Sequence, residues 1–331
     1  MININYSSIP QKYLDYIDRF KGKIKKWYND GEMGNGKTKI TVCHECKLIF
    51  RYLLIRDNLK VLLLLDADKL PVLIHKVEQK FPLLKKDRLD KPKPRSELYQ
   101  CLNKAFYSLG YCDQEFPDFE ITSSLGLRAC PYCNAEEIIV QDLKDEGVHI
   151  RNSELDHFYP RELYPFLAIS LYNLVPSGSI CNQGSCKHNK DSLVEGLVNP
   201  FELQDPDGLL FELVIENKDL LSYRLQLFKR SCSIKMHVIN ARLEANARIF
   251  LIEPRYSKEL EQARKVWWKY KKYASNGYRN MADRISDQLD VNLTYEEWFE
   301  MELDIRPNNY NYRKLSKLSM DIWRQLEQMN I

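Results

Sequence analysis

Cysteines are the residues in this sequence whose spacing most clearly suits metal binding. Cys130 and Cys133 flank Pro131-Tyr132, and a second group, Cys181 and Cys186, follows further along the chain. Zinc prefers four soft ligands in a tetrahedron, and two residues between paired cysteines allow one turn to supply two of them. Thiolates at these positions would bind a structural zinc ion rather than perform a reaction.

Between the two cysteine groups lie polar residues that could act on a water molecule. Asp156 is followed directly by His157, Asn173 comes later, and Asn182 follows Cys181. A neutral imidazole can accept a proton from water at cellular pH. Carboxylate and amide oxygens are suitable ligands for Mg²⁺. A lone Asp-His pair would more simply be a surface or capping pair, so the argument depends on the order of all these motifs.

In this order the motifs resemble the core of the HNH endonucleases, a ββα-metal finger held together by zinc. The resemblance implies that His157 is the general base and that Asp156 binds a catalytic Mg²⁺ or Mn²⁺ ion. It implies that Asn173 positions the loop that orients the histidine. Asn182 lies where the family has its last metal ligand, and His188 is the alternative because of the insertion that precedes it.

The resemblance also implies the zinc ligands. Many zinc-containing HNH domains have a second CxxC pair just before the last metal ligand, but here Gly178 stands at the first position of that pair. Cys186 is the natural replacement, because a wider turn can still give tetrahedral geometry. We therefore predict zinc bound by Cys130, Cys133, Cys181 and Cys186, the alternative being a three-cysteine site to which Cys186 does not belong.

One branch of the family is especially similar. Asp156–Pro160, Cys181-Asn182 and Asn199–Phe201 resemble the HNH component of Septu-type and retron-associated anti-phage systems, in which the nuclease works alongside an ATPase. The motif match covers about residues 130–200, with a weaker similarity to about 250. It implies a DNA endonuclease with an ATPase partner. The competing hypothesis is a zinc-dependent nucleic-acid-binding or scaffold subunit that does not cleave.

The whole chain sets broad limits. Its 331 residues allow two to three domains, and 44% apolar with 29% charged residues is ordinary for a globular protein. The formal charge of +3 does not by itself indicate nucleic-acid binding. The sequence contains neither an apolar run of membrane-spanning length nor a signal-peptide pattern. Nine cysteines without a secretion signal predict a reducing, cytoplasmic location.

Periodicity and composition predict a mainly helical α+β protein: a helical region 1–120, the nuclease core 121–200 and a mainly helical region 201–331. Lys85–Arg95, with two prolines, is expected to be a loop. Short β-type runs around Lys144–Gly147 predict a hairpin with Asp156 and His157 at its exit. Further expected elements are helices over 10–28, 40–56, 97–109, 241–251, 257–273 and 312–329, strands over 208–215 and 224–228, and a strand or helix over 58–68.

Three other signals carry competing interpretations. Gly31–Thr38 satisfies the Walker A pattern, but it follows a basic, helix-periodic segment instead of the buried strand that a P-loop requires. Cys43 and Cys46 form another CxxC pair, which could bind zinc or lie buried on one face of a helix. Arg264–Tyr273 mixes cations with aromatic side chains. It could bind nucleic acid, or bury its aromatic rings and leave its lysines in water.

Overall fold

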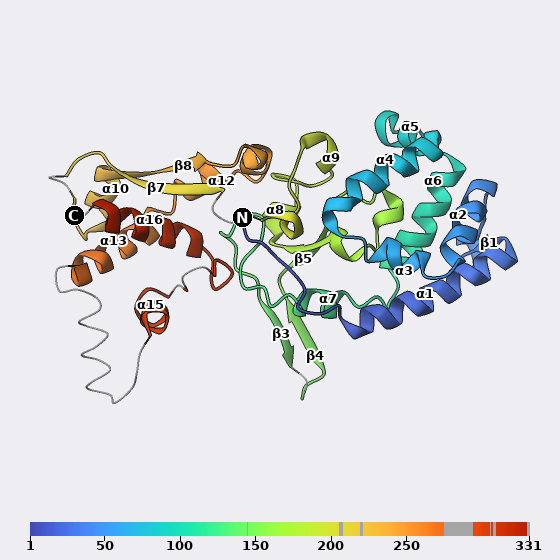
Figure 1. Cartoon of the computed structure of the whole chain (residues 1–331), viewed down its shortest axis with the longest axis horizontal. Coiled ribbons are helices and arrows are strands. Elements are labelled where there is room, and N and C mark those ends of the chain that lie inside the picture. Colours follow the sequence, from blue (N-terminus) through green and yellow to red (C-terminus); the bar gives the residue numbers. More distant parts are fainter. Residues whose placement is uncertain are drawn as a thin grey trace.

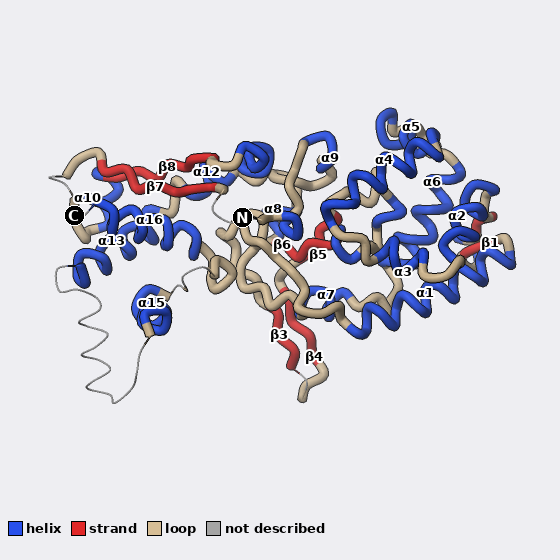
Figure 2. Tube along the Cα trace, in the orientation of Figure 1, coloured by secondary structure: helices blue, strands red, loops and turns tan. Residues whose placement is uncertain are grey.

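The structure, a computed structural model, describes residues 1–143, 145–204, 208–218, 221–274, 294–304, 306 and 309–329. Within these ranges the chain is an α+β protein with much more helix than strand, as predicted. Its named strands pair in four antiparallel two-stranded sheets (Figure 2). Helices gather at both ends of the molecule, and the segment with the metal-ligand motifs lies between them (Figure 1). Over the same ranges the helices are too short or too polar to cross a membrane.

The N-terminal region is helical because its helices bury apolar stripes. Tyr13, Ile17, Phe20, Ile24 and Trp27, spaced three or four apart, are all buried on α1. The helix ends at Gly31, whose φ of 70° suits a glycine C-cap. The elements are α1 (Gln11–Asp30), β1 (Glu32–Met33), β2 (Ile40–Thr41), α2 (His44–Leu54), α3 (Asn58–Leu63), α4 (Leu70–Lys80), α5 (Pro82–Asp90), α6 (Glu97–Leu102), the π-helix η3 (Asn103–Tyr111) and α7 (Asp118–Ser123).

One prediction in this region was wrong. The segment Lys85–Arg95, expected to be a loop, is helical in α5 as far as Asp90 and irregular only afterwards. Pro82 lies in the first turn of α5, where a proline is tolerated, and the helix ends at Lys91 in the left-handed conformation. The two later prolines therefore follow the helix rather than interrupt it. The ambiguous 58–68 segment begins with the helix α3.

The central region contains two hairpins. The predicted one is confirmed: β3 (Val140–Leu143) pairs with β4 (Val148–Arg151). Asp156 and His157 belong to a second hairpin, in which β5 (Glu154–His157) pairs with β6 (Leu174–Ser177). The short helices α8 (Ser179–Asn182) and α9 (Ser192–Glu195) follow.

The C-terminal region consists of a longer hairpin covered by helices. Strand β7 (Leu209–Ile215) pairs with β8 (Cys232–Val238), and α13 and α16 pack against them and each other (Figure 1). The predicted strand 224–228 was wrong: these residues enter α10, in which Phe228 is buried against Trp267. The helices are α10 (Leu225–Ser231), α11 (Glu244–Ile249), α12 (Ile252–Tyr256), α13 (Leu260–Ala274), α15 (Tyr295–Leu303), which opens with a capping box between Thr294 and Glu297, and α16 (Ser316–Met329).

A continuous hydrophobic cluster extends through all three regions. The turn that carries Cys130 and Cys133 lies at its centre and is fixed from both sides. The Ile2 N–H donates to Pro131 O at 2.9 Å. On the other side, buried Asn134 accepts the Lys317 N–H on Oδ1 at 3.0 Å and donates to Tyr310 O at 2.7 Å. The metal-ligand turn is therefore anchored to segments far away in the sequence.

Candidate metal centre and active site

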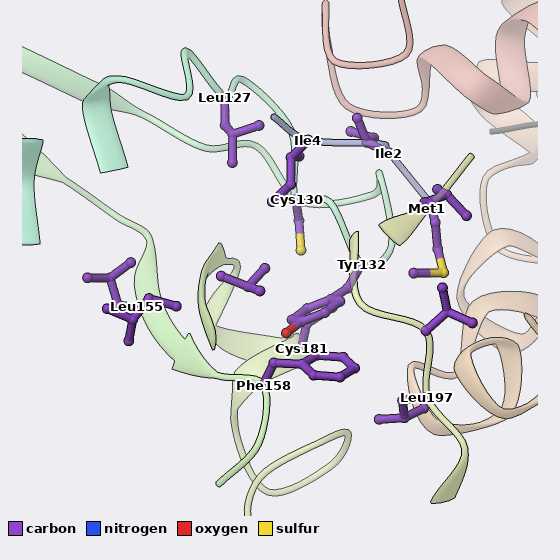
Figure 3. Packing of buried hydrophobic residues seen from close by; sticks show 14 of the residues in the cluster. Met1, Ile2, Ile4, Leu127, Cys130, Tyr132, Leu155, Phe158, Cys181 and Leu197 are labelled. Atoms are coloured by element: carbon purple, nitrogen blue, oxygen red, sulfur yellow. The ribbon is translucent and has the colours of Figure 1, made fainter. Parts of the chain in front are cut away.

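The cysteine pair predicted to bind zinc does meet a third cysteine. One ligand atom each from Cys130, Cys133, Cys181 and Glu136 lies within 4.8 Å of the other three. The three cysteines are at most 1% exposed. Figure 3 shows Cys130 and Cys181 among the apolar side chains around Tyr132. Three thiols and one carboxylate suit a tetrahedral zinc ion, so these residues could hold a metal.

Hydrogen bonds to sulfur support this assignment. The Gly178 N–H donates to Cys130 Sγ at 3.4 Å, and the Ala135 N–H donates to Cys133 Sγ at 3.3 Å. The Arg255 guanidinium of α12 lies 3.2 Å from Cys181 Sγ. Donors and a cation aimed at sulfur stabilise thiolates, which are the form that binds metal.

Glu136 reaches the thiols for two reasons: the chain turns back toward Cys130, and residue 178 is a glycine, which leaves room for the carboxyl group. The Cys130 N–H donates to Glu136 O at 2.9 Å, which brings the glutamate back beside the first cysteine. A Cβ at Gly178 would overlap the Glu136 carboxyl group. The glutamate therefore fills the space that a side chain at position 178 would occupy. Arg255 holds the same carboxylate at 3.0 Å.

Cys186 has a different position from the one predicted. Its thiol is fully buried and contacts the Cys181 thiol. It is nevertheless outside the group of four whose ligand atoms all lie within 4.8 Å of one another. The sequence could not point to Glu136, because a glutamate near a CxxC pair is common and only the fold shows which carboxylate faces the sulfurs. Cys186 remains a predicted ligand, with Glu136 as its rival.

Substitutions can show whether Glu136 or Cys186 is the fourth zinc ligand. We expect Glu136→Gln to weaken zinc binding by about 10–100-fold and Cys186→Ser to change it much less, because Glu136 faces all three thiols. Competition of each purified variant with a chromophoric zinc chelator measures the affinity. Zinc binding that weakens only in Cys186→Ser would instead assign the fourth position to the cysteine.

Asp156, the predicted ligand of a catalytic ion, is buried on β5. Its Oδ1 accepts from the Lys187 ammonium at 2.8 Å and its Oδ2 accepts from the Tyr132 hydroxyl at 2.5 Å. The ammonium, itself fully buried, also donates to the backbone oxygen of His157 at 2.8 Å. Burial lowers the pKa of Lys187, and the Asp156 carboxylate opposes this shift. The pair connects β5 with the loop after α8.

His157 has different neighbours, because successive side chains of a strand point to opposite faces. Its ring lies edge-on to Tyr111 of η3, with 4.6 Å between ring centroids, and near Tyr107. Its Nε2 lies 2.9 Å from Ala168 O. A carbonyl can only accept, so Nε2 carries the proton and Nδ1 keeps a lone pair. The pKa of His157 is lowered to about 3, mainly by burial; the hydrogen bond to Ala168 O opposes this shift, and the charges of Arg161 and Lys187 add to it.

Asn173 holds the loop around this histidine. Its Oδ1 accepts the Tyr159 N–H at 2.7 Å, while its Nδ2 donates to Tyr159 O at 3.2 Å and to Leu167 O at 3.0 Å. Leu167 directly precedes Ala168, the partner of the His157 ring. This is the arrangement expected of a positioning residue.

The two alternative metal ligands have other surroundings than a direct bond to Asp156. Asn182 donates from Nδ2 to Glu154 Oε2 at 2.6 Å. His188 is exposed and has a φ of 43°. The structure thus brings Lys187 and Tyr132, rather than Asn182 or His188, to Asp156. Sequence reasoning missed both, since Tyr132 stands between the two cysteines of the CxxC pair and Lys187 lies between Cys186 and His188, at positions to which the motif assigns no role.

The low pKa of His157 predicts that the unfolding free energy falls as the pH is lowered. The folded state leaves the ring neutral down to about pH 3, while the unfolded chain takes up a proton near its ordinary pKa of about 6.5. The histidine therefore costs stability progressively as the pH falls below 6.5. Between pH 7.5 and 5 we expect the wild type to lose about 2 kcal/mol more unfolding free energy than His157→Gln. Urea unfolding at both pH values measures this, and equal losses would contradict it.

The other CxxC pair lies in the helical region. Cys43, Cys46 and, on α6, Cys101 are buried, and their thiols contact one another. Over the described ranges, only the group of Cys130, Cys133, Glu136 and Cys181 brings its ligand atoms within 4.8 Å of one another. The Walker-like segment Gly31–Thr38 follows the helix α1, not a strand.

Comparison of this chain with protein-family models, with curated proteins and with solved structures finds no match. The motifs and the geometry around them therefore carry the functional argument.

Proposed function

We propose that this chain is an endonuclease that hydrolyses phosphodiester bonds of DNA, with His157 as the general base. The observation that carries the proposal is the geometry of this ring. Its Nε2 is held by Ala168 O, which leaves Nδ1 as the acceptor, and its low pKa keeps it neutral at cellular pH. A neutral, oriented imidazole can remove a proton from an attacking water molecule. A pKa this low also makes it a weak base, so its orientation must contribute much of the effect.

Two cations near the histidine suit a phosphodiester substrate. The Arg161 guanidinium lies 3.6 Å from the centroid of the Tyr107 ring, which also borders His157. Guanidinium groups bind phosphate oxygens with two parallel hydrogen bonds. The buried Lys187 ammonium adds positive charge behind the strand. We propose that Arg161 orients the phosphate while His157 acts on the water.

Metal binding at the two sites is supported unequally. Cys130, Cys133 and Cys181 with Glu136 fit zinc, which would hold α8 and the turn after Ala129 together. At Asp156 the donors do not fit a divalent ion as arranged, because Lys187 and Tyr132 occupy both carboxylate oxygens. The Mg²⁺ or Mn²⁺ ion implied by the resemblance would have to displace the ammonium. We derive no catalytic step from such an ion.

The same contacts favour a second candidate function. A protein that binds nucleic acid without cleaving it would keep the zinc site and could use Asp156 as a structural ion-pair partner. Asp156 and His157 point to different surroundings, which is the specific observation in favour of this alternative. The proposed role in cytoplasmic anti-phage defence, together with a partner ATPase, rests on the motif resemblance.

Cleavage of supercoiled plasmid by the purified chain tests the proposal. Wild type and His157→Ala are each incubated with added Mg²⁺, added Mn²⁺ or EDTA. Cutting by the wild type alone supports the nuclease, and its dependence on added ion decides whether a divalent cation takes part. Equal cutting by both proteins contradicts His157 as the base. If neither protein cuts but both bind DNA, the non-cleaving alternative is favoured.

A further inference from the structure

The helix α13 separates its aromatic residues between the core and the surface. Trp267 and Tyr270 are buried, whereas Trp268 is 48% exposed. The sequence left open whether these rings face inward or outward, and the answer differs from ring to ring. Burial of Val266, Trp267 and Tyr270 already accounts for the packing of this face against α10 and α16. Trp268 is therefore available for another role.

A second exposed ring lies beside Trp268. Tyr223, just before α10, is 55% exposed, and its ring centroid lies 5.5 Å from that of Trp268 at an interplanar angle of 45°. The Arg264 guanidinium donates to Tyr223 O at 2.5 Å, which fixes the tyrosine backbone to α13. Two adjacent aromatic rings thus face solvent on a connected support.

Cations border the two rings. Lys265 and Lys272 are exposed and Lys269 is partly exposed. Lys265 and Lys272 lie three positions before and four after Trp268 and so share its side of the helix, whereas Lys269 directly follows Trp268 and lies beside this stripe. Arg224 follows Tyr223 in the sequence and is also exposed. Glu261 lies 3.5 Å from Lys265 and offsets part of the charge, but cations remain in excess on this stripe.

We propose that this surface, formed by Tyr223, Trp268, Lys265, Lys269 and Lys272 and called here the α13 surface, binds unpaired DNA. Exposed aromatic rings stack with nucleic-acid bases, and each stacked base contributes about 1–3 kcal/mol. Lysines beside the rings neutralise backbone phosphates. The proposal deepens the proposed function, on which it rests, by naming single-stranded segments as the substrate class.

The chemistry favours unpaired over duplex DNA. In a duplex the base faces stack on one another and are not available to exposed aromatic side chains. In a single strand they can stack on Trp268 and Tyr223, without regard to sequence. The α13 surface should therefore bind an oligonucleotide more tightly than the same length of duplex, with a preference that depends on the rings rather than on charge alone.

Fluorescence anisotropy with a labelled oligothymidine tests this, using full-length protein in the His157→Ala background so that cleavage does not interfere. Trp268→Ala is expected to weaken binding about tenfold, and Trp268→Phe should retain most of the affinity. Lys269→Ala should lower the slope of log affinity against log salt by about 0.7. Tyr52→Ala is the matched control, because Tyr52 is 60% exposed on the distant helix α2.

The outcomes separate this proposal from the proposed function. Unchanged oligonucleotide binding in Trp268→Ala and Tyr223→Ala, or absence of binding at low salt, would overturn the α13 surface whatever the plasmid assay gives. Tighter binding of duplex than of single strand would also overturn it, as would preferential binding of an oligouridine RNA. Weakened binding in Trp268→Ala without any cleavage by wild type would support the surface while the nuclease proposal fails.

Discussion

Replacing His157 by alanine is expected to reduce plasmid cleavage by about 10²–10⁴-fold, the usual contribution of a general base. The ring is the only group of the proposed mechanism that accepts the proton of water. Its loss therefore removes the proton transfer and leaves substrate binding in place. The structure supports this by showing the ring oriented through Ala168 O and neutral through burial. Substrate affinity should change little, because phosphate binding is assigned to Arg161.

The control for this prediction is another histidine. His149 on β4 is about half exposed and lies against Asp142 and Phe119, away from the β5–β6 hairpin. His149→Ala should cleave like the wild type, and zinc content and thermal stability should remain close to wild type in both variants. If His149→Ala loses as much activity as His157→Ala, the assignment of the base fails.

The second large effect is expected at the zinc site. Cys130→Ala should lose the metal and with it the folded core around residues 121–200. Structural zinc contributes about 10–16 kcal/mol of binding free energy in small domains, as much as the whole stability of many proteins. Here the site joins the Cys130–Glu136 turn to α8, and the same turn is bonded to Ile2 and to α16. Loss of zinc should therefore affect segments beyond residues 121–200.

Zinc content by elemental analysis and near-ultraviolet circular dichroism measure this result. Cys232→Ala is the control, since Cys232 is equally a buried cysteine but lies on β8. It should keep its zinc and lose only the modest stability expected of a small cavity, about 1 kcal/mol. A folded, zinc-free Cys130→Ala protein would falsify the structural role of the metal.

Several features could be predicted from the sequence because they depend on neighbouring residues. The stripe on α1, the turn between β3 and β4 and the capping box at Thr294 follow from spacing and local hydrogen bonding. The pairing of Cys130 with Cys133 belongs to the same class. At 224–228 the prediction failed because burial of Phe228 against Trp267 decided the outcome. At 85–95 it failed because Pro82 lies in the first turn of α5 and the later prolines follow its end.

The composition of the site depended instead on contacts between distant segments. The motif indicated Cys130, Cys133, Cys181 and Asn173; the three cysteines lie close enough together to hold a metal, and Asn173 bonds the backbone of Tyr159. The motif could not indicate that Glu136 fills the space above Gly178. A glycine only leaves room, and the fold decides which side chain takes it.

The adjacency of Asp156 and His157 illustrates the same limit. As neighbours in sequence they suggested one shared site, but within β5 their side chains face opposite sides. There they meet Lys187 and Tyr132 on one side and the tyrosines of η3 on the other. Residue types and spacing were enough to indicate the candidate chemical groups and the helices and hairpin near them. The partners of each group depend on the folded chain, because side-chain direction and burial arise from long-range packing.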